Sequence, residues 1–423
     1  MKRYIAALCA SDERPMHVCL ISPGHLSANP RLVKEARALK SAGLEVSVVC
    51  GSYLPWGVEA DRALALELGN VTAVPFGPSA LDRAGYLRTT ILRHLARNLV
   101  RAGLRNAMLE TWAQHPAAGG LRRAAEAIAA DLYIAHYVAA LPAAASAARL
   151  HGSRYAFDAE DFHFGDLPDV PQNAFERNLI RSLEGRLLPR CAFITAASPL
   201  IAEAYAGTYG ITAPTTVLNV FARCAAPAAP TRQGSKKPGP SVYWFSQVVG
   251  PGRGLETLID ATAQAKRRPH LYLRGTPANG YAHELRARAE LMGIGGNLHL
   301  LDPVPPADLE RDGAQFDLGY AGELMNSPNH ERALSNKLFS YLSSGIPVVM
   351  SNTPAQSSIA PELGVAAMTF TQGDAGALAN AIDSMLAPNR LAQARRSAWE
   401  LGQAQFAWEN EAPKLVRLVM ACR

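Results

Sequence analysis

The strongest constraint on the fold is a repeated order along the chain: a short apolar run, a loop that often contains glycine, and an amphipathic helical segment. From His17 the sequence reads "HVCLISPGHLSANPRLVKEARALKSAGLEVSVVCG", in which two apolar runs flank a helix. Asn29 is a favoured N-cap residue, Pro30 suits the first helical position, and Gly43 suits the helix end. Continuous apolar runs of this length are typical of buried strands in parallel sheets. The pattern therefore predicts a β-α-β unit.

The same alternation returns in residues 131–161 and 190–220, and again after residue 240. We therefore predict an α/β protein with two Rossmann-like, doubly wound domains. The expected parts are a disordered or tag-like N-terminus at 1–15, an N-terminal domain at 16–221, a proline-rich linker at 222–240, a C-terminal domain at 241–394, and a last helical segment at 395–423 that crosses back to the N-terminal domain. Ligands of such folds bind beyond the carboxyl ends of the strands, so we expect a cleft between the two domains.

The composition excludes several classes of protein. Apolar residues make up 48% and charged residues 18% of 423 positions, which is typical of a globular chain with room for two or three cores. The net charge of +6 favours anionic ligands or an anionic membrane surface, but it is too dispersed to indicate nucleic-acid binding. The cysteines form no CxxC pair and predict reduced thiols in a cytosolic protein. The N-terminal apolar run is too short for a signal peptide, and no uncharged stretch is long enough to span a membrane.

The stretch "LSNKLFSYLSSGIPVVMS", residues 334–351, predicts a short helix that feeds a buried parallel strand. Ser335 is an N-cap type, and Gly345 suits the left-handed position that ends a helix. Lys337 falls in the first helical turn, where the helix dipole disfavours a cation unless an anion lies beyond the terminus. We therefore expect a phosphate there; a solvated lysine on a capped helix is the alternative.

Three segments, taken in order, resemble the GT-B glycosyltransferases of family four: "NPRLVKEARALKSAG", "GPGRGLETLIDA" and "LSNKLFSYLSSGIPVV". The resemblance runs from residue 16 to about residue 390. Most enzymes of this family are retaining and use nucleotide sugars. The resemblance implies a donor bound mainly by the C-terminal domain, an acceptor bound mainly by the N-terminal domain, and no metal.

Cleavage of a sugar–diphosphate bond leaves about two negative charges on the departing nucleotide, and arginine, lysine and backbone amides can meet them. The motif "GPGRG", residues 250–254, offers a flexible backbone, the Arg253 guanidinium and a helix N-terminus. We expect Arg253 and Lys337 to be catalytic in this sense, although "GPGRG" could be a plain strand-to-helix turn. The expected donor-binding residues are Gly250, Gly252, Arg253, Arg274, Gly275, Glu331, Ser335, Asn336, Lys337 and Ser340.

The sequence departs from the family at a pair of glutamates that are commonly separated by seven residues. The matching positions here hold Arg332 and Ser340. A serine hydroxyl would make only a weaker, neutral hydrogen bond to a donor. Glu331 is our expected substitute, with Asn336 and Glu323 as alternatives.

The segment "FDAEDFHFGD", residues 157–166, follows a predicted strand and carries Asp158, Glu160, Asp161 and His163. Related enzymes often have an aspartate with a histidine two positions on, where this chain has Glu160. We expect these four residues to bind acceptor hydroxyls or to act in catalysis, with one carboxylate as a base. Solvated or capping loop residues, or a metal site of the DxE type, are the alternatives.

Gly24, His25 and His136 lie at the ends of other predicted strands, and we expect them on the acceptor side together with Asp161 and His163. Glycine would let the loop approach a ligand closely. A lone histidine in an apolar run is otherwise a hydrogen-bonded core residue.

Residues 86–106 predict a basic amphipathic helix. One stripe carries Arg93, Arg97, Arg101 and Arg105, and the other face carries Ile91, Leu92, Leu95 and Leu99. We predict a surface helix whose apolar face packs on the core. The alternative is a helix that lies on the anionic inner membrane or receives a lipid-diphosphate acceptor.

The sequence thus predicts a bacterial-type, cytoplasmic, retaining glycosyltransferase of polysaccharide biosynthesis. It would move a sugar from a nucleoside-diphosphate sugar, which serves as the co-substrate, to a carbohydrate or lipid-linked glycan. We expect no cofactor and no nucleic-acid partner. The alternatives are a nucleotide-sugar epimerase of the same fold and a non-catalytic relative that binds a glycan or acts as a scaffold.

Overall fold

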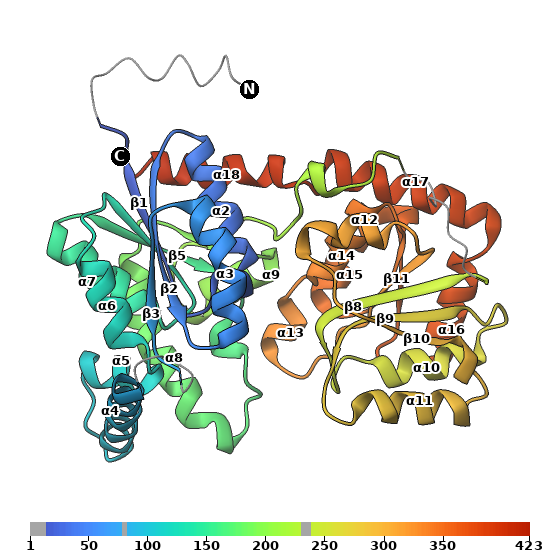
Figure 1. Ribbon diagram of the computed structural model, residues 1–423, viewed down its shortest axis with the longest axis horizontal. Helices are drawn as coiled ribbons and strands as arrows, with labels where there is room; N and C mark the ends of the chain where they lie inside the picture. The colour runs from blue at the N-terminus through green and yellow to red at the C-terminus, as the bar shows by residue number, and fades with distance from the viewer. Residues whose placement is uncertain (1–13, 78–82, 230–237) are drawn as a thin grey trace. The chain divides into compact units, whose positions relative to one another are not determined.

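The computed structural model describes residues 14–77, 83–229 and 238–423 (Figure 1). The expected N-terminal segment 1–15 therefore lies almost wholly outside the described residues, as does the middle of the expected linker 222–240. The chain forms two compact units: Met1–Val217 with Ala412–Arg423, called the N-terminal domain below, and Leu218–Glu411, called the C-terminal domain. The predicted α/β class, with two Rossmann-like domains, is confirmed.

The N-terminal domain is built on a parallel sheet in the order β3-β2-β1-β4-β5-β6-β7. Its strands are β1 (His17–Ser22), β2 (Glu45–Ser52), β3 (Val71–Pro75), β4 (Leu132–His136), β5 (Arg154–Ala159), β6 (Ile194–Ala196) and β7 (Thr215–Thr216). Its helices are α2 (Pro30–Ser41), α3 (Pro55–Leu68), α4 (Arg83–Arg101), α5 (Ala107–Gln114), α6 (Ala118–Glu126), α7 (Leu141–His151), α8 (Ala174–Leu187) and α9 (Pro199–Tyr209).

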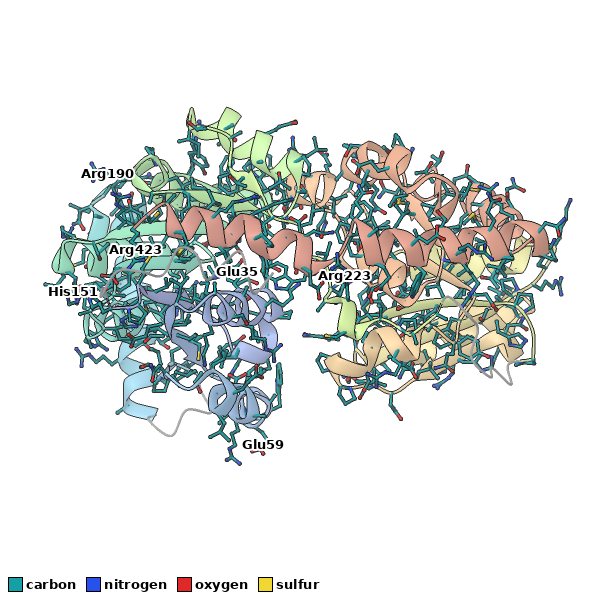
Figure 2. All side chains as sticks on the ribbon, turned by 90° about the horizontal axis from the view of Figure 1, so that it is seen from above. Glu35, Glu59, His151, Arg190, Arg223 and Arg423 are labelled. Carbon is teal, nitrogen blue, oxygen red and sulfur yellow. The ribbon has the colours of Figure 1, made fainter. Side chains whose placement is uncertain are left out.

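The first β-α-β unit forms for the reasons that its sequence suggests. Asn29 caps α2 by accepting a hydrogen bond from the backbone N–H of Leu32, and Pro30 takes the first turn. Strands β1 and β4 are buried along their whole length, as a sheet covered on both faces requires. Charged side chains such as Glu59 extend into solvent, whereas Glu35 on α2 lies inside the domain (Figure 2).

The C-terminal domain has a second parallel sheet in the order β10-β9-β8-β11-β12-β13. Its strands are β8 (Ser241–Val249), β9 (His270–Pro277), β10 (Leu298–Leu301), β11 (Leu318–Ala321), β12 (Val348–Ser351) and β13 (Ala367–Phe370). Its helices are α10 (Leu255–Gln264), α11 (Tyr281–Leu291), α12 (Leu309–Gly313), α13 (Pro328–Arg332), α14 (Asn336–Ser344), α15 (Pro354–Leu363), α16 (Ala375–Met385) and α17 (Pro388–Ala404). Helix α18 (Trp408–Met420) begins here, and from Ala412 onward it belongs to the N-terminal domain.

Each sheet reverses its strand order at one point, between β1 and β4 in the N-terminal domain and between β8 and β11 in the C-terminal domain. Loops that leave adjacent strands at such a point run in opposite directions and open a crevice, where ligands of doubly wound folds bind. The segments that follow β1 and β4, and those that follow β8 and β11, are therefore the places to look for function.

Helix α14, which carries Lys337, is fixed to this crevice by one tyrosine. The Tyr341 hydroxyl lies 3.0 Å from the carbonyl oxygen of Tyr243 on β8 and 3.1 Å from that of Tyr320 on β11. Gly319 on β11 leaves room for the tyrosine ring, because a Cβ at this position would lie 2.4 Å from ring atoms. The position of α14 thus depends on a glycine in the neighbouring strand.

Helix α4 is amphipathic as predicted, but the prediction that its apolar face packs on the core is wrong. Four of its larger apolar side chains are exposed, Leu87 by 59%, Ile91 by 49%, Leu95 by 55% and Leu99 by 40%, whereas Leu92 is half-buried. The smaller Ala96 and Val100 face the domain instead. The Arg97 guanidinium pairs with Glu176 and lies over the Phe175 ring, so part of the arginine stripe turns inward.

Two expectations from composition concern cysteines and membrane spans. The described cysteines carry free thiols: Cys19, Cys50, Cys191, Cys224 and Cys422. In the described part of the chain, no helix combines the length and the apolar character that crossing a bilayer would need.

Replacement of Gly319 by alanine should destabilise the C-terminal domain. The added methyl group would overlap the Tyr341 ring, and overpacking of this kind costs about 1–3 kcal/mol of unfolding free energy. Gly296→Ala is the control, because no atom lies within 4 Å of the position that its methyl group would take and the residue is exposed. Urea denaturation followed by tryptophan fluorescence should show a loss for Gly319→Ala and a change within about 0.5 kcal/mol for Gly296→Ala. Equal effects would contradict this account of how α14 is anchored.

Candidate functional sites

In the C-terminal domain, the "GPGRG" loop after β8 contacts the end of β11. The Tyr320 hydroxyl donates a hydrogen bond to the carbonyl oxygen of Gly254, over 2.9 Å. Gly254 has a φ of +68°, and a Cβ there would lie 2.7 Å from the Tyr320 hydroxyl oxygen and 3.2 Å from the Gly322 carbonyl oxygen. Both the backbone conformation and the close approach require glycine. The turn places the exposed Arg253 beside the segment that follows β11.

That segment carries Glu323, whose carboxylate is the centre of the site. Its Oε1 atom accepts hydrogen bonds from Ser335 Oγ, at 2.7 Å, and from Lys337 Nζ, at 3.2 Å. Burial opposes ionisation of Glu323, but the charge of Lys337, the two hydrogen bonds and the charge of Arg253 outweigh it and lower the pKa of this carboxyl below 4.5. Arg253 and Lys337 therefore act on the same carboxylate, although they come from loops far apart in the sequence.

Lys337 is further restrained by Trp244 on β8, since Nζ lies 5.6 Å from the centroid of the indole ring. Ser335 precedes α14, yet its side chain reaches Glu323 and does not cap the helix. The N–H groups of the first turn of α14 thus have no side-chain cap. A helix start of this kind favours an anion.

The other predicted donor residues fall into two groups. Gly252 (φ +75°), Asn336 and the partly exposed Glu331 lie at or near the surface, and Gly250 is buried in the loop after β8. Glu331 pairs with its neighbour Arg332, at 3.1 Å. Their part in donor binding stays a prediction.

In the structure, Ser340, Arg274 and Gly275 have structural roles, which differ from the donor binding expected for them. Ser340 is buried, and its hydroxyl donates to Glu310 Oε1 at 2.9 Å. Arg274 is buried and donates to the Tyr243 hydroxyl at 3.0 Å. A Cβ on Gly275 would lie 2.2 Å from the Ser246 carbonyl oxygen, so this glycine is needed for strand packing. These three residues support the domain from within.

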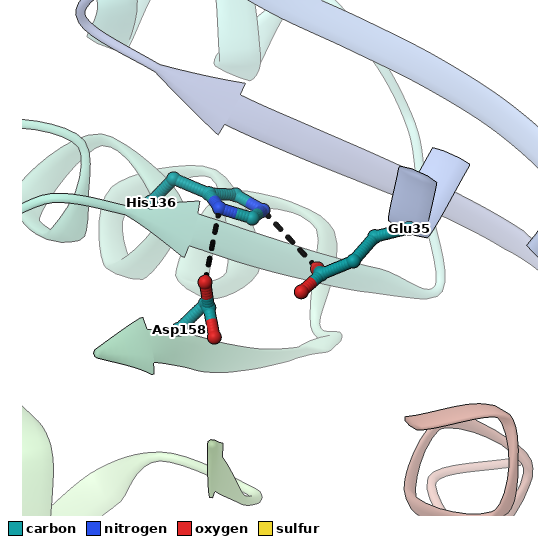
Figure 3. A group of neighbouring side chains, drawn as sticks. All are labelled: Glu35, His136 and Asp158. Atoms are coloured by element: carbon teal, nitrogen blue, oxygen red, sulfur yellow. Dashed lines mark ion pairs between the residues drawn. The ribbon is translucent and has the colours of Figure 1, made fainter. Parts of the chain in front are cut away.

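In the N-terminal domain, His136 lies between two buried carboxylates (Figure 3). Its Nδ1 atom is 3.3 Å from Asp158 Oδ2, and its Nε2 atom is 3.4 Å from Glu35 Oε2. Burial opposes protonation of the imidazole, but Glu35 and Asp158 outweigh it and raise the pKa of His136 to about 10. His136 is therefore a buried cation.

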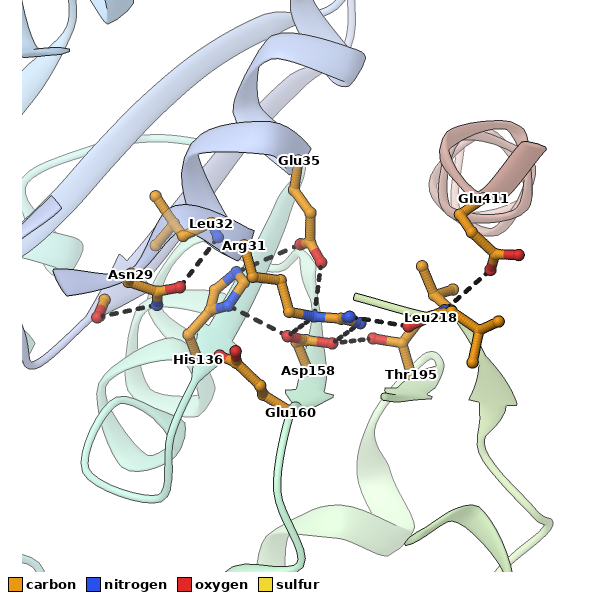
Figure 4. A network of polar contacts seen from close by, with 12 residues as sticks. Asn29, Arg31, Leu32, Glu35, His136, Asp158, Glu160, Thr195, Leu218 and Glu411 are labelled. Carbon is orange, nitrogen blue, oxygen red and sulfur yellow. Dashed lines mark hydrogen bonds and ion pairs between the residues drawn. The ribbon is translucent and has the colours of Figure 1, made fainter. Parts of the chain in front are cut away.

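Arg31 on α2 completes this cluster (Figure 4). Its guanidinium binds Asp158 in bidentate fashion, with Nε–Oδ2 at 2.7 Å and Nη2–Oδ1 at 2.8 Å, and its Nη1 atom donates to the Val217 carbonyl oxygen at 2.8 Å. Thr195 Oγ1 also donates to Asp158 Oδ1, at 2.6 Å. The two cations and the two carboxylates of the cluster neutralise one another, which is what allows them to be buried.

This arrangement differs from the roles expected for Asp158, in catalysis, and for His136, in acceptor binding. Both side chains are buried and occupied by partners within the domain, so they position the strand ends and do not face an acceptor. Glu35, His136 and Asp158 could each offer one atom to a metal ion. The Arg31 guanidinium already lies against both Asp158 oxygens, so the cluster does not fit a metal.

The segment just after β5 holds Glu160, Asp161 and His163. Burial, followed by the charge of Asp161, raises the pKa of Glu160 to about 7. The Tyr137 hydroxyl donates to Glu160 Oε2 over 3.4 Å, and Tyr137 has a φ of +65°, which is rare for a residue with a side chain. Strain of this kind is often found at functional sites. Glu160 is thus the carboxylate with a pKa near neutrality beside a strained strand end.

His163 is buried, and its Nδ1 atom is 3.2 Å from Asp166 Oδ2. Burial opposes protonation, but the hydrogen bond to Asp166 and nearby carboxylates outweigh it and raise the pKa of His163 to about 9. Its ring packs beside Tyr137, with 5.5 Å between the ring centroids. His163 therefore helps to fix Tyr137 next to Glu160.

His25 has a different part from the one expected. Its Nδ1 atom is 2.8 Å from Asp61 Oδ2, and its Nε2 atom accepts the backbone N–H groups of Tyr53, at 3.1 Å, and Leu54, at 3.0 Å. No ring nitrogen is left for an acceptor hydroxyl, and the residue is fully buried. Gly24 precedes it and donates its N–H to Ser22 Oγ, at 3.2 Å.

Sequence reasoning missed Arg31 and Glu35 and did not favour Glu323. Glu35 carried a signal, because it lies within the buried stripe formed by Leu32, Ala36 and Leu39 on α2. A charged residue in such a stripe requires a buried partner. Glu323 gave no comparable signal, because its contacts with Ser335 and Lys337 arise only from folding.

Comparison with known protein families gives two matches. Residues 28–220 match the family described as "Glycosyl transferase 4-like domain", and residues 239–388 match "Glycosyl transferases group 1". Together they span most of the chain. No curated protein sequence matches the chain significantly.

Several solved structures share the fold over nearly the whole chain. HepE from Anabaena, in complex with UDP and glucose, has a TM-score of 0.70 at 17% identity and covers 96% of this chain and 100% of its own. Sucrose-phosphate synthase from Thermosynechococcus elongatus has a TM-score of 0.70 at 16% identity, with the same coverage. A glycosyltransferase from Rickettsia africae has a TM-score of 0.66 at 10% identity and covers 97% of this chain and 99% of its own.

At these identities the structural likeness establishes the fold, and the two family matches establish the class of enzyme. The chain belongs to the glycosyltransferases of the GT-B fold and is family four-like.

Proposed function

We propose that the enzyme transfers a sugar from a nucleoside-diphosphate sugar to a hydroxyl group of a carbohydrate or lipid-linked glycan, with retention and without a metal. The observation that carries this proposal is that Arg253 and Lys337 both act on Glu323 at the switch point of the C-terminal sheet. One solved protein of the same fold, HepE, was crystallised with UDP and with UDP-glucose, which supports a nucleotide sugar as donor.

The chemistry requires positive charge where the diphosphate departs. Two cations around one carboxylate leave the cluster with a net positive charge, and the starts of α10 and α14 add N–H dipoles beside it. Arg253 provides a planar guanidinium suited to phosphate oxygens, and Lys337 provides a compact charge. The diphosphate would take the place beside Lys337 that the uncapped helix start leaves open.

Glu323 also offers a substitute for the glutamate pair that this chain lacks. Both of its side-chain hydrogen bonds go to Oε1, and within the described residues Oε2 makes none. A carboxylate oxygen that is held in place and still open can accept a hydrogen bond from a sugar or ribose hydroxyl. We assign this part to Glu323, in preference to Glu331, which pairs with Arg332.

Arg253→Ala and Lys337→Ala should each lower kcat/KM for the nucleotide sugar about a hundredfold, because each removes a donor aimed at the developing charge. Arg286→Ala is the matched control, since it removes one exposed cation from α11 in the same domain. Initial rates of nucleotide release, measured with donor and acceptor, test this. Rates within about twofold of wild type for both site variants would contradict the assignment. A requirement for the acceptor would separate transfer from epimerisation of the donor.

On the acceptor side we assign the base to Glu160. Its carboxylate lies beside the strained Tyr137, and a pKa close to the working pH suits a group that takes up a proton from an attacking hydroxyl. Asp161 contributes negative charge that raises this pKa, and His163 supports the ring of Tyr137. Asp158 contributes to this site indirectly, because it holds Arg31 and His136 in the buried cluster next to Glu160.

The rate of transfer should rise with pH through an apparent pKa near 7. Only the ionised carboxylate of Glu160 accepts a proton, and its pKa is raised from 4.5 to about 7, so the rate is low below that value and reaches a plateau above it. Glu160→Gln should abolish this limb and lower the plateau rate about a hundredfold or more. Glu203→Gln, an exposed carboxylate on α9, should leave the profile unchanged. A limb near pH 7 that persists in Glu160→Gln would rule out this base.

We assign a peripheral contact with an anionic membrane to α4. The exposed stripe of Leu87, Ile91, Leu95 and Leu99 is flanked by exposed arginines, such as Arg101. An apolar face bordered by cations suits the boundary between acyl chains and anionic headgroups. This contact would bring a lipid-linked acceptor to the enzyme.

Ile91→Asn with Leu95→Asn should reduce co-sedimentation with phosphatidylglycerol vesicles at least about tenfold, because two apolar side chains are lost from the contact. The control pair is Leu66→Asn with Leu150→Asn, which removes two leucines from α3 and α7 that are even more exposed than the test pair. The control should bind vesicles as the wild type does. Equal binding by both double variants would show that α4 is not the contact surface.

A further inference from the structure

The N-terminal domain contains a cavity of about 640 Å³ that none of the residues assigned above lines. It lies along β3, the edge strand of the sheet, and is enclosed by residues of α4, α5 and α6. The acceptor-side residues follow β4 and β5, on the other side of β1 and β2 in the strand order. The volume is typical of sites for small molecules.

The lining of this cavity is strongly basic. It contains Arg88, Arg93, Arg122 and Arg123, and among the described residues no aspartate or glutamate lines it. Arg122 has a loose pairing with Glu126, at 3.8 Å, and Arg93 Nε donates to the Ala113 carbonyl oxygen at 3.4 Å. Burial and the charge of Arg93 lower the pKa of His115 to about 4, so the imidazole in this wall is neutral. The positive charge is therefore largely uncompensated.

Hydrogen-bond donors converge on one part of the wall. A Cβ on Gly119 would lie 3.6 Å from Arg123 Nη1 and 4.0 Å from Trp112 Nε1, so both donors lie over the start of α6. The N-cap residue of α6, Ala117, provides no side-chain cap. The N–H groups of Ala117 and Ala118 bond to His115, and the next two positions of the helix are glycines, whose N–H groups no side chain among the described residues covers. Within the described chain, Trp112 Nε1 makes no hydrogen bond. Guanidinium, indole N–H and helix start together suit an oxyanion.

We propose that this cavity, which we call the arginine pocket, binds a phosphoryl group. Guanidinium groups match phosphate oxygens in charge and geometry, and a site with several arginines and no carboxylate is the arrangement that phosphate recognition uses. The phosphoryl group belongs either to a free phosphate ester or to an anionic lipid headgroup. A lipid is one of the two sources because Arg88 lies on α4 next to the exposed Leu87 and one turn from Ile91.

The first test uses inorganic pyrophosphate and isothermal titration calorimetry on the full chain. The parent variant carries Arg253→Ala and Lys337→Ala, which remove binding at the proposed donor site, so that any remaining binding reports on the arginine pocket. The pocket variant adds Arg88→Gln and Arg123→Gln to the parent and should bind pyrophosphate at least about tenfold more weakly. Both arginines are exposed, so the variant should fold. The control adds Arg149→Gln and Arg190→Gln, which remove two exposed charges elsewhere in the same domain and should change the affinity less than about twofold.

The second test distinguishes the two sources of phosphate. Phosphatidylglycerol vesicles, with phosphatidylcholine vesicles as reference, are sedimented with the pocket variant and the control variant. If only the pocket variant loses vesicle binding, the ligand is a lipid headgroup; if both bind alike while pyrophosphate binding is lost, it is a free phosphate ester. Absence of pyrophosphate binding in the parent variant, or equal affinities in the pocket and control variants, would overturn the proposal. A loss of pyrophosphate binding in the pocket variant alone locates the site even if the donor site lies elsewhere, because Arg88 and Arg123 line only the arginine pocket.

Discussion

The carboxylate of Glu323 is the group on which the C-terminal site depends. It accepts hydrogen bonds from Lys337 and Ser335, and its charge faces Arg253, so that two loops from different strands act at one point. Without this carboxylate the two cations would repel each other, and Lys337 would lose the partner that directs it across the start of α14. Because one carboxylate does not balance two cations, this cluster keeps a net positive charge.

The N-terminal domain uses its charges differently. Asp158, Glu35, Arg31 and His136 form a buried cluster with equal numbers of cations and carboxylates, which leaves no net charge for a ligand. The cluster holds β4, β5 and α2 together. Glu160, which we propose as the base, lies two residues beyond Asp158. Removal of one partner from such a cluster is costly, about 3–5 kcal/mol, because an unpaired charge stays buried. The cluster thus supports the strand ends that precede the proposed acceptor side.

The local sequence pattern correctly predicted the features that depend on neighbouring residues, namely helix ends and buried strands. The start of α2 at Asn29 and the glycine at the end of α14 follow from capping preferences, and the parallel sheets follow from continuous apolar runs. The partnership of Arg31 with Asp158 spans 127 positions and cannot be derived from either neighbourhood. The exposed face of α4 was mispredicted because a helical stripe shows which residues share a side but not which side meets the domain. The sequence therefore predicted which loops form the candidate site, whereas the ion pairs and hydrogen bonds between them became visible only in the folded structure.

The most direct test is a crystal structure of the full chain with a nucleoside diphosphate, with UDP and GDP tried in turn. We predict diphosphate oxygens within hydrogen-bonding distance, about 2.7–3.2 Å, of both the Arg253 guanidinium and the Lys337 ammonium, with the start of α14 directed at the same group. A nucleotide bound with its diphosphate away from both side chains would contradict the assignment of the donor site.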